Sequence, residues 1–332
     1  MGFNIADLFE HAVDAVPDRT ALIVGTTHLT YRELDEAANR LANHFIGQGF
    51  GTGDHIGIYG PNSVEWAISM LAAFKIRAVP ININFRYVED ELLYLFDNAD
   101  LTGLVHSREF APRVASVLDR APKLRHLVVI DDETDEDATV AGSIPFDEAA
   151  AAASPERPEL ERSPDDHYVI YTGGTTGMPK GVVWRHEDVF YALGGGVDAY
   201  TNERVTHEHQ LAEKATATAT PMVSLNAPPL MHGAAQWGML RFWFEGGTVV
   251  FVPRFSGDEI WSTIERDGVN TLMITGDAMA RPMVEALQAT PEKWDVSSLF
   301  VVSSSAAIFS PTVKEALLDL LPNVMIIDAI GS

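Results

Sequence analysis

The chain has 332 residues, 46% hydrophobic and 21% charged, with no cysteine and a formal net charge of −24. This composition is typical of a globular protein with a large core, and the lack of cysteine excludes a disulfide scaffold, a thiolate zinc site and thiol catalysis. The negative charge argues against nucleic-acid binding and requires that any anionic ligand be held by local donors or by Mg²⁺.

The sequence has no apolar run of about eighteen residues, the length of a membrane span. Its amino terminus carries Asp7 and Glu10 and no basic segment. We therefore expect no membrane span, no secretory signal and a cytoplasmic protein. The sequence leaves the oligomeric state open, a homo-oligomer included.

The first elements are a hairpin and a helix. Apolar and polar residues alternate over residues 20–31 around Gly25, which predicts a hairpin. Thr30 and Glu33 have the spacing of a capping box, so a helix is expected to follow. The glycines from Gly47 onward end this helix and predict a linker.

From residue 55 to residue 172 the patterns of strand and helix alternate, which predicts a parallel sheet covered by helices. Residues 149–164, rich in alanine, proline and charge, are expected to form a surface connection with no site. The predicted strands are residues 55–59, 78–81, 101–105, 126–130 and 168–172, and the predicted helices are 63–75, 87–97 and 108–120.

The strand at residues 168–172 leads into a loop that suits a polyphosphate. Glycines let successive N–H groups turn inward around an anion, threonine hydroxyls add donors, and lysine adds a positive charge. The order of residues excludes a Walker A loop, and an ordinary turn between a strand and a helix is the alternative. The loop contains Thr172, Gly173, Gly174, Thr175, Thr176, Gly177, Pro179, Lys180 and Gly181.

A helix is expected near residues 186–200, and residues 201–220 are then polar without clear periodicity, which predicts a surface loop. His207 and His209 lie in this segment. Because no third ligand is evident nearby, we expect them to be solvated and not to bind a metal.

A second alternating series predicts a second parallel sheet. Its strands are residues 223–226, 248–252, 271–275, 299–303 and 324–328. Its helices are residues 258–266, 278–287 and 312–320, together with a helix in the stretch 228–244 that ends at residues 245–247.

Three segments of the second series fall at strand ends and are candidate binding elements. His232 follows a strand and precedes the bulky apolar helix, so it is either a helix cap or a functional residue. Thr275, Gly276 and Asp277 form another such loop, where Asp277 is either a helix cap or part of a pocket. Small residues at 303–307 would permit close approach of a ligand.

The stretch from Tyr168 to Gly181 resembles the signature loop of the adenylate-forming superfamily, which includes acyl-CoA synthetases, luciferases and nonribosomal peptide adenylation domains. It differs at one fixed position, where Gly173 replaces the usual serine. The resemblance implies that the whole loop from Thr172 to Lys180 binds ATP and Mg²⁺. It makes Thr175, Thr176 and Lys180 catalytic, with Thr176 as the metal ligand.

The same resemblance assigns roles to the other segments. His232 would lie near the substrate carboxylate as a further catalytic residue, with Gln236 and Trp237 in the acyl pocket. Thr275, Gly276 and Asp277 would complete the pocket. The adenine element would match Ser305, Ala306 and Ala307, with Asp328, Ile330 and Gly331 as further nucleotide-binding residues.

The expected fold is therefore α/β, with two stacked doubly wound, mostly parallel sheets. Residues 54–200 would form one subdomain, and residues 1–53 with 201–332 the other. The resemblance implies the amino-terminal part of an ATP-dependent acyl-CoA synthetase acting on fatty or steroid-side-chain acids, with coenzyme A as acceptor. A binding module without catalysis and an adenylating enzyme with another acceptor are the alternatives.

Overall fold

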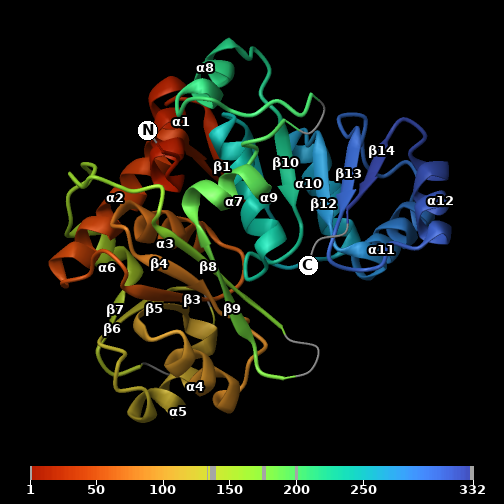
Figure 1. Cartoon of the computed structure of the whole chain (residues 1–332). Helices are drawn as coiled ribbons and strands as arrows, with labels where there is room; N and C mark the ends of the chain where they lie inside the picture. The colour runs from red at the N-terminus through yellow and green to blue at the C-terminus, as the bar shows by residue number, and fades with distance from the viewer. Residues whose placement is uncertain (1, 133, 135–139, 174–176, 199–200, 330–332) are drawn as a thin grey trace.

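The computed structural model describes residues 2–132, 134, 140–173, 177–198 and 201–329, and it contains two seven-stranded sheets (Figure 1). In the first sheet the strands follow the order β7-β6-β5-β3-β4-β8-β9, and only β8 and β9 pair antiparallel. Its strands are β3 (His55–Tyr59), β4 (Val79–Asn82), β5 (Leu101–Ser107), β6 (His126–Ile130), β7 (Ser143–Pro145), β8 (His167–Thr172) and β9 (Lys180–Arg185).

The second sheet has the order β14-β13-β12-β10-β11-β1-β2, and only the terminal hairpin β1–β2 is antiparallel. It combines the first two strands of the chain with the last five. These are β1 (Thr20–Val24), β2 (Thr27–Thr30), β10 (Val223–Asn226), β11 (Thr248–Phe251), β12 (Thr271–Ile274), β13 (Val301–Ser304) and β14 (Met325–Asp328). The expected class, two mostly parallel sheets with helices on their faces, is confirmed.

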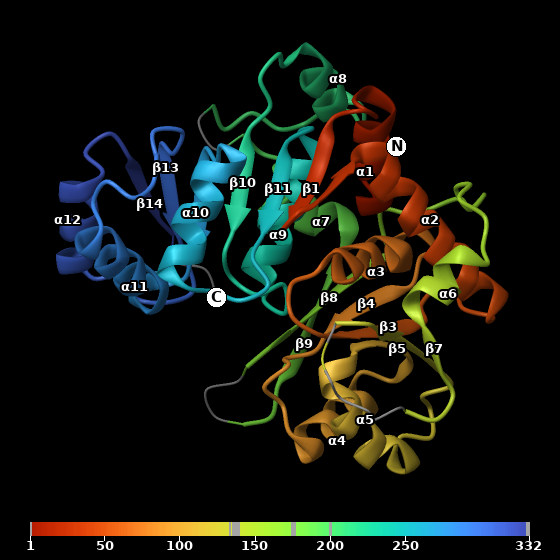
Figure 2. The same cartoon turned by 180° about the vertical axis from the view of Figure 1, so that it is seen from behind.

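A layer of helices lies between the two sheets (Figures 1 and 2). One hydrophobic cluster joins them to strands of both sheets, so the two sheets share a core. It contains Ile56 and Val128 from the first sheet and Leu22 and Phe251 from the second. The helices are α1 (Ile5–Ala15), α2 (Tyr31–Gly47), α3 (Val64–Lys75), α7 (His186–Leu193) and α9 (Gly233–Phe244).

The outer faces of the two sheets have separate cores and separate helices. On the first sheet these are α4 (Glu89–Asn98) and α5 (Ala111–Val117), which is flanked by the 3₁₀ turns Arg108–Phe110 and Leu118–Arg120. On the second sheet they are α10 (Gly257–Asp267), α11 (Gly276–Ala289) and α12 (Pro311–Leu320). The result is five alternating layers of helix and sheet (Figure 2).

Local signals explain where several elements begin. The Thr30 hydroxyl accepts from the Glu33 N–H and the Glu33 carboxylate accepts from the Thr30 N–H, so the predicted capping box of α2 is confirmed. Ser63 and Ser256 cap α3 and α10 in the same way, each accepting a backbone N–H three residues later.

The structure corrects three expectations. The segment 201–220 contains α8 (Gln210–Ala217), whose buried residues Leu211 and Ala215 pack into the central core, so it is not a plain surface loop. The segment 149–164 begins within α6 (Phe146–Ala151) and supplies Arg162, whose side chain is only 4% exposed. The patterns also do not predict α1 or β9. None of the described helices is long and apolar enough to cross a bilayer.

Candidate functional site

We call residues 172–181, the loop predicted to suit a polyphosphate, the phosphate loop. Two antiparallel strands hold its ends, because Thr172 of β8 pairs in register with Lys180 of β9. The loop therefore does not join a strand to a helix. Thr172 and Lys180 are exposed, and no heavy atom lies within 4 Å of where a Cβ atom of Gly173 or Gly177 would stand. Gly174, Thr175 and Thr176 lie outside the described residues.

Asn82, at the carboxyl end of β4, ties the base of this loop to a second element. Its Oδ1 accepts from the Tyr171 N–H at 2.8 Å, and its Nδ2 donates to the Tyr171 carbonyl at 2.9 Å and to the Met231 carbonyl at 2.6 Å. The side chain is buried. A single amide thus holds the last buried residue of β8 beside the residue that precedes His232.

His232 stands at the amino end of α9, but its side chain makes no capping hydrogen bond, so the capping alternative is wrong. The preceding turn is fixed by Asn62, which donates to the Pro228 carbonyl at 3.2 Å and accepts from the Leu230 N–H at 2.6 Å. Desolvation of the imidazole, followed by the positive charge of Arg86, lowers the pKa of His232. The ring is therefore neutral at pH 7.

Gln236 and Trp237 are buried beneath His232. Gln236 accepts from the Tyr168 hydroxyl at 2.8 Å and donates to the Leu230 carbonyl at 2.7 Å. Trp237 packs edge-on against Tyr168 with 5.0 Å between ring centroids. These contacts fasten α9 to β8, directly behind the phosphate loop. Gln236 and Trp237 therefore have a structural role, because they hold α9 against β8. Their contact with a substrate is a proposal.

A second group of residues lies at the carboxyl ends of β12 and β13. Gly276 has φ +52°, and a Cβ atom there would stand 2.3 Å from the Ile308 carbonyl oxygen, so only glycine fits. Asp277 follows Thr275, the N-cap position of α11, and its carboxylate accepts from the Ser310 N–H at 2.8 Å. Asp277 therefore does not cap α11. It attaches the loop of residues 305–309 to that helix.

This loop contains Ser305, Ala306 and Ala307, of which the last two are exposed. Ala306 has φ +67°, the left-handed region that glycine adopts most easily. Asp328 ends the neighbouring strand β14, opposite Ser304, and pairs with Lys314. Ile330 and Gly331 lie outside the described residues.

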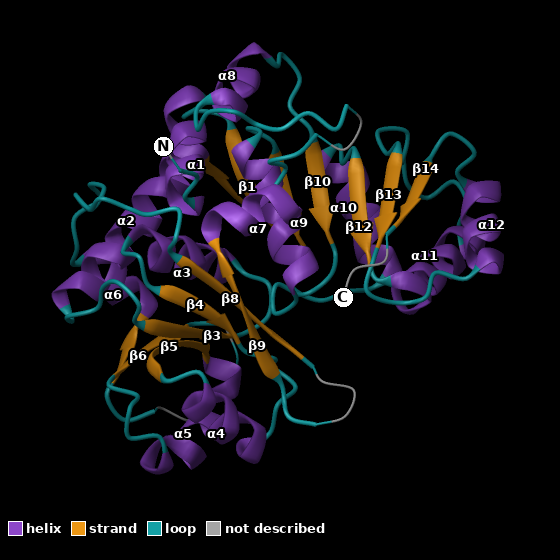
Figure 3. Ribbon diagram, in the orientation of Figure 1, coloured by secondary structure: helices purple, strands orange, loops and turns teal. Residues whose placement is uncertain are grey.

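The predicted site residues thus form two groups. The phosphate loop, His232, Gln236 and Trp237 are joined through buried contacts, while Thr275, Gly276, Asp277, Ser305, Ala306, Ala307 and Asp328 share the carboxyl edge of the second sheet. Figure 3 shows the arrowheads of β10, β12 and β13 directed toward the side on which β8 ends. Ligands of open α/β sheets bind at such edges.

Asn62 and Asn82 were missed by sequence reasoning, whereas Ser304 lies in the predicted segment 303–307 but had no role of its own. Ser304 accepts from the Gly276 N–H at 3.0 Å and so joins the ends of β13 and β12. Asn82 interrupts an apolar run at the end of a predicted strand, and a polar residue in that position is a usable signal. Its partners come from distant parts of the chain, which the pattern does not reveal.

The chain has close relatives among curated proteins. A medium/long-chain-fatty-acid–CoA/3-oxocholest-4-en-26-oate–CoA ligase of Mycobacterium marinum is 51% identical, over 100% of this chain and 61% of the relative. A 3-oxocholest-4-en-26-oate–CoA ligase of Rhodococcus rhodochrous is 49% identical, over 100% of this chain and 60% of the relative. The chain thus spans about 60% of the length of these relatives.

Solved structures share the fold. An anthranilate CoA ligase in complex with anthranoyl-AMP matches all of this chain and 60% of its own, with a TM-score of 0.83 and 23% identity. The N-terminal domain of FACL13 from Mycobacterium tuberculosis matches 99% of this chain and 76% of its own, with a TM-score of 0.78 and 21% identity. The AMP-binding enzyme family model matches residues 9–332. Because this match extends over nearly the whole chain, the protein belongs to the family of AMP-binding enzymes.

Proposed function

We propose that this protein activates a carboxylic acid with ATP, as part of an acyl-CoA synthetase. The carboxylate attacks the α-phosphorus of ATP, the bond to the bridging oxygen breaks, and pyrophosphate leaves with that electron pair. The thiol of coenzyme A then attacks the acyl carbon, and AMP leaves. The hydrogen bonds of Asn82 carry the proposal, because they hold the base of the phosphate loop beside the His232 turn.

In this proposal the phosphate loop binds the leaving diphosphate. Thr172 and Lys180 are exposed on paired strands, so a hydroxyl and an ammonium group are available at the ends of the loop, with Thr175 and Thr176 as further hydroxyl donors. These groups stabilise the charge that develops on the leaving group. Mg²⁺ suits a hydroxyl-rich donor set because it usually binds together with substrate phosphates, and we propose Thr176 as its protein ligand.

The carboxylate of the acid is proposed to lie near His232. The neutral imidazole can donate a hydrogen bond without the repulsion that another carboxylate would bring, and the charge of Arg86 that lowers the pKa of His232 also attracts an anion. Gln236 and Trp237 form the wall behind His232. The second group, Thr275 to Asp277 with Ser305, Ala306, Ala307, Asp328, Ile330 and Gly331, is proposed to receive the nucleoside.

The chemical class of the acid follows from the relatives. Those at about 50% identity are ligases of medium- and long-chain fatty acids and of 3-oxocholest-4-en-26-oate. We therefore propose a large apolar carboxylic acid as substrate and coenzyme A as the acceptor.

ATP–pyrophosphate exchange tests the proposal. Exchange should depend on the acid, with palmitate and 3-oxocholest-4-en-26-oate above acetate. Lys180→Ala should lower the rate by about tenfold to a hundredfold, because one charged donor to the leaving group is lost. Lys214→Ala, at an exposed position of α8, is the matched control and should leave the rate unchanged. Equal rates in Lys180→Ala and the parent protein would contradict the proposed role of the loop.

The same measurement distinguishes the synthetase from the second candidate, a module that binds nucleotide or acyl-adenylate without catalysis. Binding of ATP with no exchange for any acid would favour the module. Exchange that depends on the acid, followed by thioester formation only when coenzyme A is added, would favour the synthetase over an adenylating enzyme with another acceptor.

A further inference from the structure

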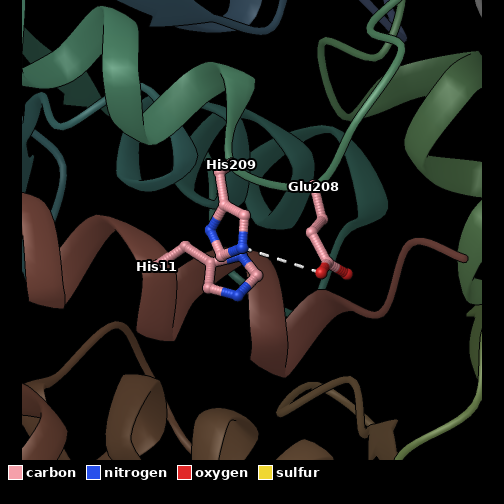
Figure 4. A group of neighbouring side chains, drawn as sticks. All are labelled: His11, Glu208 and His209. Atoms are coloured by element: carbon pink, nitrogen blue, oxygen red, sulfur yellow. Dashed lines mark ion pairs between the residues drawn. The ribbon is translucent and has the colours of Figure 1, made fainter. Parts of the chain in front are cut away.

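Two distant segments bring three metal-binding side chains together on the side of α1 that faces α8. His11 lies in the second turn of α1, while Glu208 and His209 immediately precede α8. One ligand atom from each of the three lies within 4.8 Å of the others (Figure 4). Of these three residues sequence reasoning identified only His209, together with His207 and without a third ligand, and His11 lies nearly 200 residues earlier in the chain.

The state of His11 suits a metal ligand. Its Nδ1 is buried and has no hydrogen-bond partner among the described residues, so one imidazole nitrogen lacks the partner that buried polar atoms normally have. Burial, and then the neighbouring His209, lower the pKa of His11. The rings of His11 and His209 lie 4.0 Å apart between centroids.

The donor set selects the metal. Two imidazoles and one carboxylate are a common ligand set of Zn²⁺, with a fourth position left for water, whereas Mg²⁺ and Ca²⁺ prefer oxygen ligands only. Tetrahedral Zn²⁺ ligands at about 2.1 Å from the metal stand roughly 3.4 Å apart, so ligand atoms that now lie within 4.8 Å of one another need to approach by up to about 1.4 Å. The side chains of His209 and Glu208 are 57% and 29% exposed and can rotate to do so.

The backbone around the cluster is already fixed. Leu211 and Ala215 of α8 are buried in the core that α1 shares. Glu208 lies 3.7 Å from His209, while the nearby His207 pairs instead with Glu213 at 3.8 Å. His207 is therefore outside the cluster, although it lies on the same segment.

We propose that His11, Glu208 and His209 form a Zn²⁺ site that fastens the start of α8 to α1. Because the chain after α8 enters β10 and then the turn that carries His232, the metal would restrain the segment that leads into the candidate functional site.

Zinc binding to the purified protein, free of affinity tags, tests this inference. Titration with Zn²⁺ against a chromophoric chelator should give one tight site per chain. His11→Gln and His209→Ala should each weaken it by about tenfold or more, because each removes one of three protein ligands. His207→Ala and His28→Ala, both at exposed positions, should retain the affinity of the parent protein.

Hydrogen exchange gives the second readout. Zn²⁺ should slow exchange of the α8 amides in the parent protein and in His207→Ala, but not in His209→Ala. His209 is exposed, so we expect His209→Ala to keep the fold. This variant therefore tests zinc binding even if His11→Gln fails to fold. The inference is overturned if no stoichiometric Zn²⁺ binds, if both ligand variants bind as tightly as the parent protein, or if His207→Ala abolishes binding.

Discussion

At the scale of single residues, Ala306 adopts a conformation that its side chain disfavours. Its φ of +67° lies in the left-handed region, which glycine adopts most easily. The loop keeps this shape because Gly276, Asp277 and Ser310 hold it from both sides. Sequence reasoning placed small residues here, but it could not show which of them carries the strain.

Ala306→Gly should therefore stabilise the protein. Removing Cβ from a left-handed residue gains roughly 1–2 kcal/mol, and the greater freedom of glycine in the unfolded chain offsets about half of this. We expect a net gain of about 1 kcal/mol in the free energy of unfolding, measured with urea. Ala307→Gly is the control, because Ala307 does not have a positive φ, and it should not stabilise. A less stable Ala306→Gly protein would contradict the prediction.

Asn82 is a positioning residue, because its amide contacts the backbone on both sides of the site. Asn82→Ala would leave the N–H and carbonyl of Tyr171 and the carbonyl of Met231 without this partner. We expect a loss of about 2–4 kcal/mol in stability, since buried polar groups would be unsatisfied. Acid-dependent pyrophosphate exchange should fall as well.

The control for Asn82 is Asn43→Ala on α2, where the amide donates to the carbonyls of Ser154 and Glu156 near the surface. This change should cost about 1 kcal/mol and leave exchange unaltered. Equal losses of stability in the two variants would show that the Asn82 bonds are no more important than surface ones.

At the scale of elements, a buried ion-pair network joins α1, α2 and α3. Lys75, at the end of α3, is fully buried and donates to Asp35 of α2 at 2.6 Å and to Glu10 of α1. Arg162 also pairs with Glu10, at 2.8 Å, and belongs to the segment expected to be a surface connection. Burial alone would raise the pKa of Glu10, but Lys75 and Arg162 outweigh it and lower the pKa to about 2.

Lys75→Met should therefore be strongly destabilising. Methionine has a similar size, but it leaves two buried carboxylates without their shared cation, which typically costs about 3–5 kcal/mol. The control is Lys123→Met, because Lys123 pairs with Asp97 and Asp100 at an exposed site, where solvent screens the ion pairs and little loss of stability is expected. Urea unfolding of both variants measures the difference, and similar losses would refute the role of the network.

At the scale of the whole molecule, His186 connects three parts of the central layer. Its Nδ1 accepts from the Ile5 N–H, its other nitrogen faces the His167 carbonyl, and its ring packs on Phe74. Burial lowers the pKa of His186 from 6.5 to about 4, against the opposing effect of Asp166. Protonation would remove the acceptor of the Ile5 N–H and place a charge in the shared core.

The lowered pKa of His186 makes the stability of the protein depend on pH. Because the pKa of His186 is lower in the folded state than in the unfolded chain, its contribution is complete above pH 6.5 and is lost as the pH falls through 4. This difference between the pKa values of the folded and unfolded states corresponds to about 3 kcal/mol in the free energy of unfolding. His186→Asn, which keeps an acceptor but cannot titrate there, should show a flatter curve between these values. The exposed His28→Asn control should keep the slope of the parent protein, and an unchanged slope in His186→Asn would contradict the prediction.

Much of the molecule follows from local patterns. The alternation of strands and helices, the capping box at Thr30 and the strand before the glycine-rich loop depend on periodicity and turn chemistry within a short window, and the structure confirms these elements. The patterns missed α1, β7, α6, β9 and α8, and two of these, β9 and α8, depend on neighbouring elements. Strand β9 forms because β8 lies beside it, and α8 because its short apolar face meets α1.

The sequence by itself determined the two-sheet α/β class, the position of the phosphate loop in the chain and the family resemblance, because each depends on residues that are contiguous in the sequence. Only the tertiary structure decided which distant side chains meet: Asn82 with Met231, Lys75 with Glu10 and Asp35, and His11 with Glu208 and His209. Such contacts depend on how helices cross and sheets stack. Those arrangements are set by the packing of the whole core, which no local pattern encodes.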